Sequence, residues 1–177
     1  MPVVLGVTGF KGCGKSEVRK YLARSYGFTH LPMAGPLKAM LAAIGLTDEQ
    51  LNGSTKEVPC AVLCGSTPRH AMRTLGTEWG RMMVANNLWT HLWQQSAISC
   101  KTPLVTDDVR FENEFAAVRE LGGKVLRVTR LGHQATAHAS EAMMAELEPD
   151  YGITNNGSLI DLHRSIDRAV HVLRLGR

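Results

Sequence analysis

A glycine-rich segment near the start of the chain holds the residues best suited to chemistry. Residues 9–16 read Gly-Phe-Lys-Gly-Cys-Gly-Lys-Ser and match the pattern GxxxxGK[ST]. Glycines let the backbone curl so that successive N–H groups point inward, and a following helix N-terminus adds its positive dipole. We therefore expect a loop that binds the phosphates of a nucleoside triphosphate. The expected contacts are Gly9, Gly12, Cys13, Gly14, Lys15, which would reach the outer phosphates, and Ser16, which would ligate Mg²⁺.

A second acidic element follows an apolar run at Pro103–Thr106. In nucleotide-binding proteins with such a loop, an acid at the end of a neighbouring strand holds Mg²⁺. Asp107 or Asp108 could do this, and since adjacent side chains of a strand point to opposite faces, we expect only one to do so. The alternative is that Asp107, Glu112 and Glu114 cap the next helix.

Two arginines are placed to contact a ligand. Arg110 lies just past a strand end, where ligands bind in open parallel sheets, although a salt bridge to a nearby glutamate is the alternative. Arg130 begins a polar stretch in the place where small kinases carry a lid whose arginines close over the transferring phosphoryl group. His138, near Ser140 and Glu141, is expected to be structural.

The helix expected over Pro68–Val84 has two unlike faces. At 100° per residue, the face expected to be core holds Met72, Leu75, Trp79, Met82 and Met83, and the opposite face holds Arg69, Arg73, Gly76, Thr77 and Gly80. Each helical glycine costs about 1 kcal/mol, so two of them suggest close approach of a nucleotide whose phosphate the arginines bind. A tight helix–helix contact at the glycines is the alternative. Trp89 either stacks on a base or packs.

Strand and helix signals alternate along the chain, which predicts an α/β fold with a parallel sheet covered by helices on both faces. The expected strands are Val3–Thr8, Phe28–Leu31, Pro103–Thr106, Val125–Val128 and Tyr151–Thr154. The expected helices are Lys15–Ser25, Pro36–Ile44, Pro68–Val84, Leu88–Ile98, Glu112–Leu121, Ser140–Leu147 and Ser158–Leu175. The last carries an apolar stripe of Leu159, Leu162, Ile166, Val170 and Leu173, and Thr47–Cys64 is expected to be irregular.

Composition narrows the classes of function. The net charge of +4 is mild and the basic residues form no run, which suits small anions better than stable nucleic-acid binding. No stretch of about 18 apolar residues predicts a membrane helix, and the N-terminus does not read as a signal peptide. Cys13, Cys60, Cys64 and Cys100 lack the spacing of a zinc site and are expected to be free thiols.

The motifs together closely resemble the deoxynucleoside monophosphate (dNMP) kinases of bacteriophages. The resemblance spans nearly the whole chain in order, through GFKGCGKS, RHAMRTLGTEWGR, TDDVRFENE, HASE and ITNNGSLIDL. It implies a single three-layer P-loop kinase domain over 1–177, similar to nucleoside monophosphate kinases, with a helical acceptor-binding insert at about 32–100 and a short lid at about 130–141.

Residue by residue, the resemblance implies ATP phosphates at Gly12, Lys15 and Ser16, with Mg²⁺ at Ser16 and Asp108. It implies dNMP and catalytic contacts at Arg69, His70, Arg73, Gly76, Thr77, Trp89, Asp108, Arg110 and Glu114, and so selects Asp108 over Asp107. The sequence departs from the family at His70, where lysine is common, and at Arg73, where glutamine is common, which leaves the accepted base open.

The function expected is transfer of the ATP γ-phosphoryl group to a dNMP, with ATP and Mg²⁺ as cofactors. We expect a cytoplasmic protein, in the host cytoplasm if phage or prophage encodes it, with no membrane partner; a homodimer is left open. The rival readings are a P-loop kinase acting on a coenzyme precursor, sugar or shikimate-like acid, a nucleotide-binding regulator, and a nucleic-acid-binding ATPase. A guanine-reading NKxD motif is missing, and Asn155-Asn156-Gly157 is the nearest feature.

Overall fold

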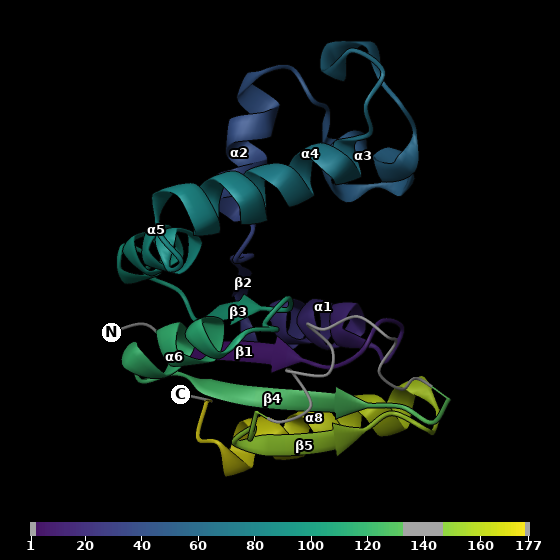
Figure 1. Cartoon of the computed structure of the whole chain (residues 1–177). Helices are drawn as coiled ribbons and strands as arrows, with labels where there is room; N and C mark the ends of the chain where they lie inside the picture. Colours follow the sequence, from purple (N-terminus) through teal and green to yellow (C-terminus); the bar gives the residue numbers. More distant parts are fainter. Residues whose placement is uncertain (1–2, 133–146, 176–177) are drawn as a thin grey trace. The chain divides into compact units, whose positions relative to one another are not determined.

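The computed structural model describes residues 3–132 and 147–175. Its internal contacts divide the chain into two compact units, one formed by Met1–Pro32 with Gln94–Arg177 and the other by Met33–Trp93 (Figure 1). The first unit contains the sheet and the second is helical. The expectation of one kinase domain with an insert at 32–100 and a lid at 130–141 stays a prediction.

A parallel sheet of five strands forms the centre of the first unit. Its strands are β1 (Val4–Thr8), β2 (Thr29–His30), β3 (Leu104–Thr106), β4 (Lys124–Thr129) and β5 (Tyr151–Thr154), in the order β2-β3-β1-β4-β5. Gly6 of β1 pairs with Thr106 on one side and with Val125 on the other, so β1 is central. All pairs are parallel, and the carboxyl ends of the strands therefore meet at one edge.

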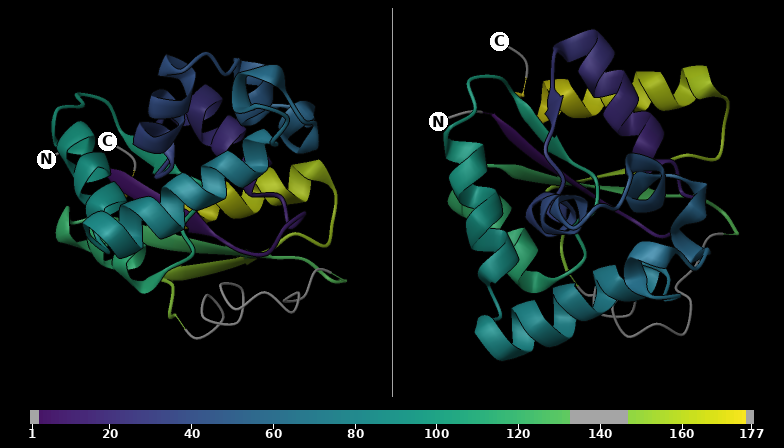
Figure 2. Two further views of the ribbon diagram at one scale, coloured as in Figure 1. Left: turned by 45° about the horizontal axis from the view of Figure 1, so that its top comes forward. Right: turned by 90° about the horizontal axis from the view of Figure 1, so that it is seen from above.

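Helices cover both faces of this sheet, which confirms the predicted fold class (Figure 2). On one face Leu5 and Val7 of β1 join a core with residues of α1 (Lys15–Tyr26) and α8 (Leu159–Val172). On the other, α6 (Glu112–Glu120) packs so closely that a side chain at Gly6 would lie 3.3 Å from Val118. Burial on both faces explains why β1 is apolar from Val4 to Val7.

The final helix begins at a complete cap and buries most of its predicted stripe. Ser158 accepts a hydrogen bond from the Asp161 N–H, while the Asp161 carboxylate accepts one from the Ser158 N–H. Leu162, Ile166 and Val170 are buried and Leu173 packs against them. Leu159 is 54% exposed, so the prediction was wrong there: it is the first residue of the helix and lies beyond the core.

The second unit packs short helices around a small core of Leu41, Leu46 and Leu51. Its elements are α2 (Gly35–Ala43), α3 (Asp48–Asn52), η1 (Ser54–Glu57), η2 (Ala61–Leu63), α4 (Pro68–Thr74), η3 (Leu75–Val84) and the start of α5 (Leu88–Ile98). The expectation of irregular structure over Thr47–Cys64 was wrong for α3. That helix begins at a capping box in which Thr47 and Gln50 satisfy each other's backbone N–H groups.

The helix predicted over Pro68–Val84 changes type part-way. It is α-helical only to Thr74 and then continues as the π-helix η3, in which the Ala85 N–H donates to the Gly80 carbonyl five residues earlier. Met72 and Leu75 of the expected core face pack against the small core, as predicted. A spacing of 100° per residue no longer applies further along η3, so the prediction is wrong for Met82 and Met83. Met82 is 74% exposed and Met83 77%, whereas Gly80 is buried.

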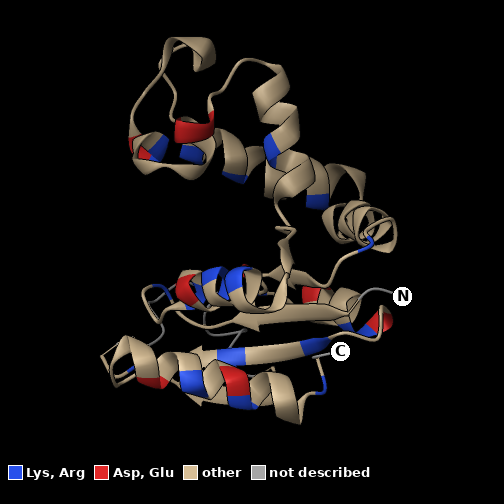
Figure 3. Ribbon diagram, turned by 180° about the vertical axis from the view of Figure 1, so that it is seen from behind, with Lys and Arg blue, Asp and Glu red and all other residues tan. Residues whose placement is uncertain are grey.

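Charged side chains of both signs are interspersed over the ribbon rather than separated into one basic face (Figure 3). The four cysteines are free thiols, as predicted. None of the helices within 3–132 and 147–175 is long and apolar enough to cross a membrane.

Candidate active site

The glycine-rich segment forms a loop between β1 and α1. Gly9, Gly12 and Gly14 have φ of 141°, 83° and 111°, a region of the backbone map that favours glycine. At Gly9 a side chain is also excluded by space, because its Cβ would lie 2.3 Å from the Val128 carbonyl oxygen. The loop's path therefore depends on glycine at these positions.

Lys15 and Ser16 open the helix that follows the loop. Lys15 Nζ donates to the carbonyl oxygens of Gly9 at 2.5 Å and Phe10 at 2.9 Å, so the ammonium group lies over the loop. Ser16 is exposed in the first turn of α1, a 12-residue helix whose N-terminal dipole favours anions. The Cys13 side chain is fully buried in the core, so any contact of Cys13 with phosphate must come from its backbone.

The two adjacent aspartates after β3 have different partners. Asp107 accepts from Arg19 Nε at 3.0 Å and lies 2.8 Å from His30 Nε2. Burial raises the pKa of Asp107, but the hydrogen bonds and charges of His30 and Arg19 outweigh it, and the net pKa lies below the ordinary value. Asp108 instead accepts from the Thr106 hydroxyl at 2.8 Å. Asp107 therefore serves a structural network, which leaves Asp108 as the candidate at the sheet edge.

Arg110 and Glu114 are joined through the backbone. The Glu114 carboxylate is 5% exposed and accepts from the N–H groups of Arg110 at 2.7 Å and Phe111 at 3.2 Å. It thereby holds the first turn of α6, as the capping alternative foresaw. The Arg110 side chain is exposed at the same place. In this arrangement Glu114 positions Arg110, and direct ligand contact by Glu114 stays a prediction.

A hollow of about 200 Å³ lies where β4 and β5 end. It is lined by Thr129, Arg130, Leu131, Gly132, Thr154 and Asn156. Of the expected lid, only residues 130–132 fall within the described chain; His138, Ser140 and Glu141 lie outside the described residues. Arg130 therefore lines this hollow, in the same unit as the phosphate loop.

The candidate acceptor residues of the second unit lie along α4. Arg69, His70 and Arg73 are all exposed. Arg69 Nε donates to Glu57 at 2.9 Å, and Arg73 Nη2 lies 3.5 Å from His70 Nδ1. Thr67 caps the helix by accepting from the His70 N–H at 3.1 Å. The two arginines, four residues apart, share one face of the α-helical part as expected.

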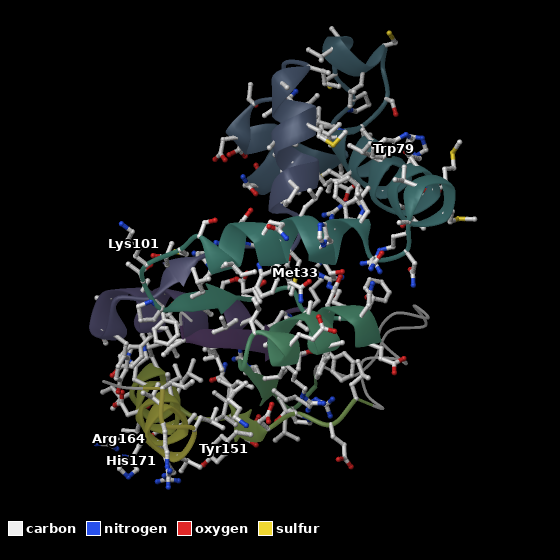
Figure 4. The ribbon with its side chains drawn as sticks, turned by 90° about the vertical axis from the view of Figure 1, so that its left-hand side faces the viewer. Met33, Trp79, Lys101, Tyr151, Arg164 and His171 are labelled. Atoms are coloured by element: carbon white, nitrogen blue, oxygen red, sulfur yellow. The ribbon has the colours of Figure 1, made fainter. Side chains whose placement is uncertain are left out.

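The glycines of η3 are explained in part by a tryptophan. Trp89 is 6% exposed and its Nε1 donates to the Gly76 carbonyl at 2.8 Å. A Cβ at Gly80 would lie 2.4 Å from the same Nε1. Its neighbour Trp79, labelled in Figure 4, is 39% exposed, with its ring centroid 6.1 Å from that of Trp89. Packing thus accounts for Gly80 and Trp89. Stacking of Trp89 on a base stays a prediction. Ligand contacts by Gly76 and by the exposed Thr77 also stay predictions.

Comparison with known proteins agrees with these features. A family model described as deoxynucleotide monophosphate kinase matches residues 64–166. A protein of Acanthamoeba polyphaga mimivirus, provisionally named a deoxynucleotide monophosphate kinase, is 32% identical over 182 residues, 93% of this chain and 94% of that protein. The chain belongs to the deoxynucleotide monophosphate kinase family.

Another member of the family and one solved structure show a weaker likeness. The deoxynucleotide monophosphate kinase of Enterobacteria phage T4 is 30% identical over 114 residues, which cover 59% of this chain and 46% of the phage protein. Among solved structures, shikimate kinase from Aquifex aeolicus has a TM-score of 0.54 at 10% identity and covers 99% of this chain and 100% of that one. At so low an identity, this likeness concerns the fold alone.

Three polar residues at the end of β5 lie outside the set of site residues predicted from sequence. Thr154 and Asn156 line the hollow, and Asn155 Nδ2 donates to the Cys13 carbonyl at 2.9 Å. The available signal was the pair of amides placed directly after a strand, at the edge where ligands bind.

Proposed function

We propose that this chain is an ATP-dependent phosphotransferase that moves the γ-phosphoryl group of ATP to the 5′-phosphate of a deoxynucleoside monophosphate, giving dNDP and ADP. The observation that carries the proposal is a phosphate loop, with three glycines at positive φ and Lys15 lying over it, in a member of this family. The relatives are themselves named deoxynucleotide monophosphate kinases.

The donor nucleotide would bind to the first unit. The N–H groups of the loop and the helix N-terminus would bind its phosphates, and Lys15 would exchange the Gly9 and Phe10 carbonyls for phosphate oxygens. The hollow at the ends of β4 and β5 would take the base, because it is concave and combines apolar with a few polar groups. Arg130 at its rim would stabilise charge on the transferring group.

Ser16 and Asp108 would hold Mg²⁺ together with the phosphates. Within the described residues there is no cluster of three or more His, Cys, Asp or Glu side chains that could form a metal cage. One or two protein oxygens plus substrate phosphates are what Mg²⁺ uses in kinases, so the residues present fit this ion. When bound, the ion neutralises charge on the phosphate oxygens.

The acceptor would bind through the second unit and the sheet edge. Its proposed contacts are Arg69, His70, Arg73, Gly76, Thr77 and Trp89, with Asp108 and Arg110, which Glu114 positions. The attacking phosphate oxygen is already anionic near neutral pH, so no strong general base is needed. Catalysis would then consist of alignment and of charge neutralisation by Lys15, the ion and the arginines.

Arg73 would influence which base is accepted. Glutamine, common in the family at this position, offers one donor and one acceptor, whereas a guanidinium only donates. Two donors match a base edge that presents two acceptors, as guanine does with O6 and N7. We therefore expect dGMP to be the preferred acceptor.

The test is an ADP-release assay with ATP and each of the four dNMPs, AMP as the ribose control, and shikimate, sugars and coenzyme precursors as rival acceptors. We expect turnover with dNMPs, highest with dGMP, and loss of at least about a thousandfold in kcat/KM for Lys15→Ala with an unchanged circular dichroism spectrum. Full activity of Lys15→Ala would contradict the mechanism. Turnover only with a rival acceptor would contradict the substrate class.

A further inference from the structure

Asn155 connects the sheet to the phosphate loop. It follows β5 directly, and its backbone N–H donates to the Thr129 carbonyl at 2.8 Å, which extends the β4–β5 ladder by one bond. Its side-chain Nδ2 donates to the Cys13 carbonyl at 2.9 Å. The backbone of Asn155 is thus fixed by the sheet, while its amide reaches a carbonyl of the loop.

The loop needs such a donor because of how it curls. A loop whose N–H groups face an anion turns its carbonyls elsewhere, and those carbonyls require partners of their own. Gly14's carbonyl is taken by the first turn of α1, where the Glu17 N–H lies 3.0 Å away. The carbonyls of Gly9 and Phe10 are taken by Lys15, and that of Cys13 by Asn155.

A bound triphosphate would affect the hydrogen bonds of Lys15 and Asn155 to the loop carbonyls differently. Lys15 is expected to turn to the phosphates, so its bonds to the loop carbonyls would be given up. The Asn155 amide points at a carbonyl rather than at the phosphate side, so its bond can persist. Asn155 is therefore the side chain suited to hold the loop's shape while the nucleotide is bound.

The amide also lies directly against the loop's last glycine. A Cβ at Gly14 would come within 2.5 Å of Asn155 Nδ2 and 3.9 Å of Leu162. The φ of 111° requires glycine at this position, and a side chain there would displace the Asn155 amide. The absence of a side chain at Gly14 therefore leaves the space that the Asn155 amide occupies.

Asn156, the next residue, forms a hydrogen bond in the hollow at the ends of β4 and β5. Asn156 Oδ1 accepts from the Leu131 N–H at 2.8 Å, and both residues line the hollow. Two consecutive amides after β5 therefore hold the loop on one side and the hollow on the other. A change at Asn155 should act on the donor nucleotide rather than on the acceptor.

We propose that Asn155 is a positioning residue for the triphosphate, which keeps the phosphate loop in its anion-binding conformation through the Cys13 carbonyl. The proposal rests on the proposed function for the identity of the triphosphate as ATP. It concerns binding, so it can be tested even if no phosphoryl transfer is found.

Two substitutions at Asn155 distinguish loss of the hydrogen-bond donor from addition of a negative charge. Asn155→Ala removes the amide, and Asn155→Asp places a carboxylate oxygen against the Cys13 carbonyl. Calorimetric titration of the full chain with MgATP alone should give a Kd raised about five- to tenfold for Asn155→Ala and further for Asn155→Asp. Titration with dGMP should stay within about twofold of the wild type. Gln95→Glu on the exposed side of α5 makes the same amide-to-carboxylate change as a control.

The outcome separates a positioning role from a merely structural one. Weaker ATP binding with unchanged dGMP binding, and a smaller rise in Tm on adding ATP, would support the proposal. An ATP Kd within twofold of wild type in folded Asn155→Ala would overturn it. Equal weakening of both nucleotides, or failure of both variants to fold, would also overturn it, because the amide would then serve the fold as a whole. Normal ATP binding without dNMP turnover in the wild type would instead reject the proposed function.

Discussion

At the scale of single residues, neighbours of one chemical type have separate roles. Asp107 and Asp108 are consecutive, yet the first is held by Arg19 and His30 and the second by the Thr106 hydroxyl. The strand end turns their side chains in different directions. The carboxylate with the arginine and histidine partners stabilises the first unit, and the other lies at the carboxyl edge of the sheet, where the phosphate loop begins.

Replacing Asp107 by Asn should lower the free energy of unfolding at pH 7 by about 1–2 kcal/mol. This is the lower part of the range for a hydrogen-bonded ion pair, because the partner side chains are 28% and 31% exposed. The pKa of Asp107 is lower in the folded chain than its ordinary value of 3.8. Its contribution is therefore complete above that value and is lost as the pH falls through the folded pKa.

Urea unfolding of wild type and Asp107→Asn at pH 7 and at about pH 3 would measure this effect. The difference between the two proteins should shrink at the lower pH, since protonation removes the same charge from the wild type. An equal difference at both values would mean that the ion pair does not stabilise the fold.

At the scale of elements, the change from α- to π-helix at Leu75 decides which neighbours Gly76 and Gly80 contact. In η3, Gly80 turns to the indole of Trp89 and is buried, while Met82 and Met83 turn outward. Gly76 contributes its carbonyl to the same indole but has room for a side chain. The two glycines, equivalent by sequence, therefore differ in their tolerance of substitution.

Gly80→Ala should lower the free energy of unfolding by about 1–3 kcal/mol, because its Cβ would lie 2.4 Å from Trp89 Nε1 and force the indole to move. Gly76→Ala is the matched control. Its Cβ would meet Leu37 Cδ1 at an ordinary 3.5 Å, so its stability should be unchanged or higher by up to about 1 kcal/mol. Thermal unfolding compares them, and equal losses would refute the packing account of Gly80.

At the scale of the whole molecule, the phosphate loop proposed to bind ATP and the arginines proposed to bind the dNMP belong to different units. The first holds the phosphate loop and the hollow, and the second holds the arginines of α4. Variants of the phosphate loop and variants of the α4 arginines should therefore each change the kinetics of one substrate. This makes the assignment testable by the separate Michaelis constants for ATP and for dNMP.

Arg69→Ala should raise the KM for dNMP about tenfold or more and leave the KM for ATP within about twofold, since a guanidinium–phosphate bond is lost on the acceptor side. Glu57→Gln is the control. It breaks the 2.9 Å ion pair with Arg69 but keeps the guanidinium, so the KM for dNMP should stay near wild type. If both variants raised it equally, Arg69 would act through its ion pair rather than through substrate.

The sequence by itself determined the sheet, the phosphate loop and the family. A buried strand reads as a continuous apolar run, and GxxxxGK[ST] specifies a backbone path, so both signals are local. The capping box at Thr47–Gln50 is equally local, although irregular structure was predicted there. The family followed because its motifs occur in order along the chain.

Only the tertiary structure decided which neighbours each side chain meets. In the π-helix η3, the Trp89 indole bonds the Gly76 carbonyl and packs on Gly80, contacts made with a residue of the following helix. The link from Asn155 to Cys13 joins residues 142 positions apart, and the Asp107 network joins three elements. Such contacts depend on how separate elements pack, so no periodicity or spacing within one segment encodes them.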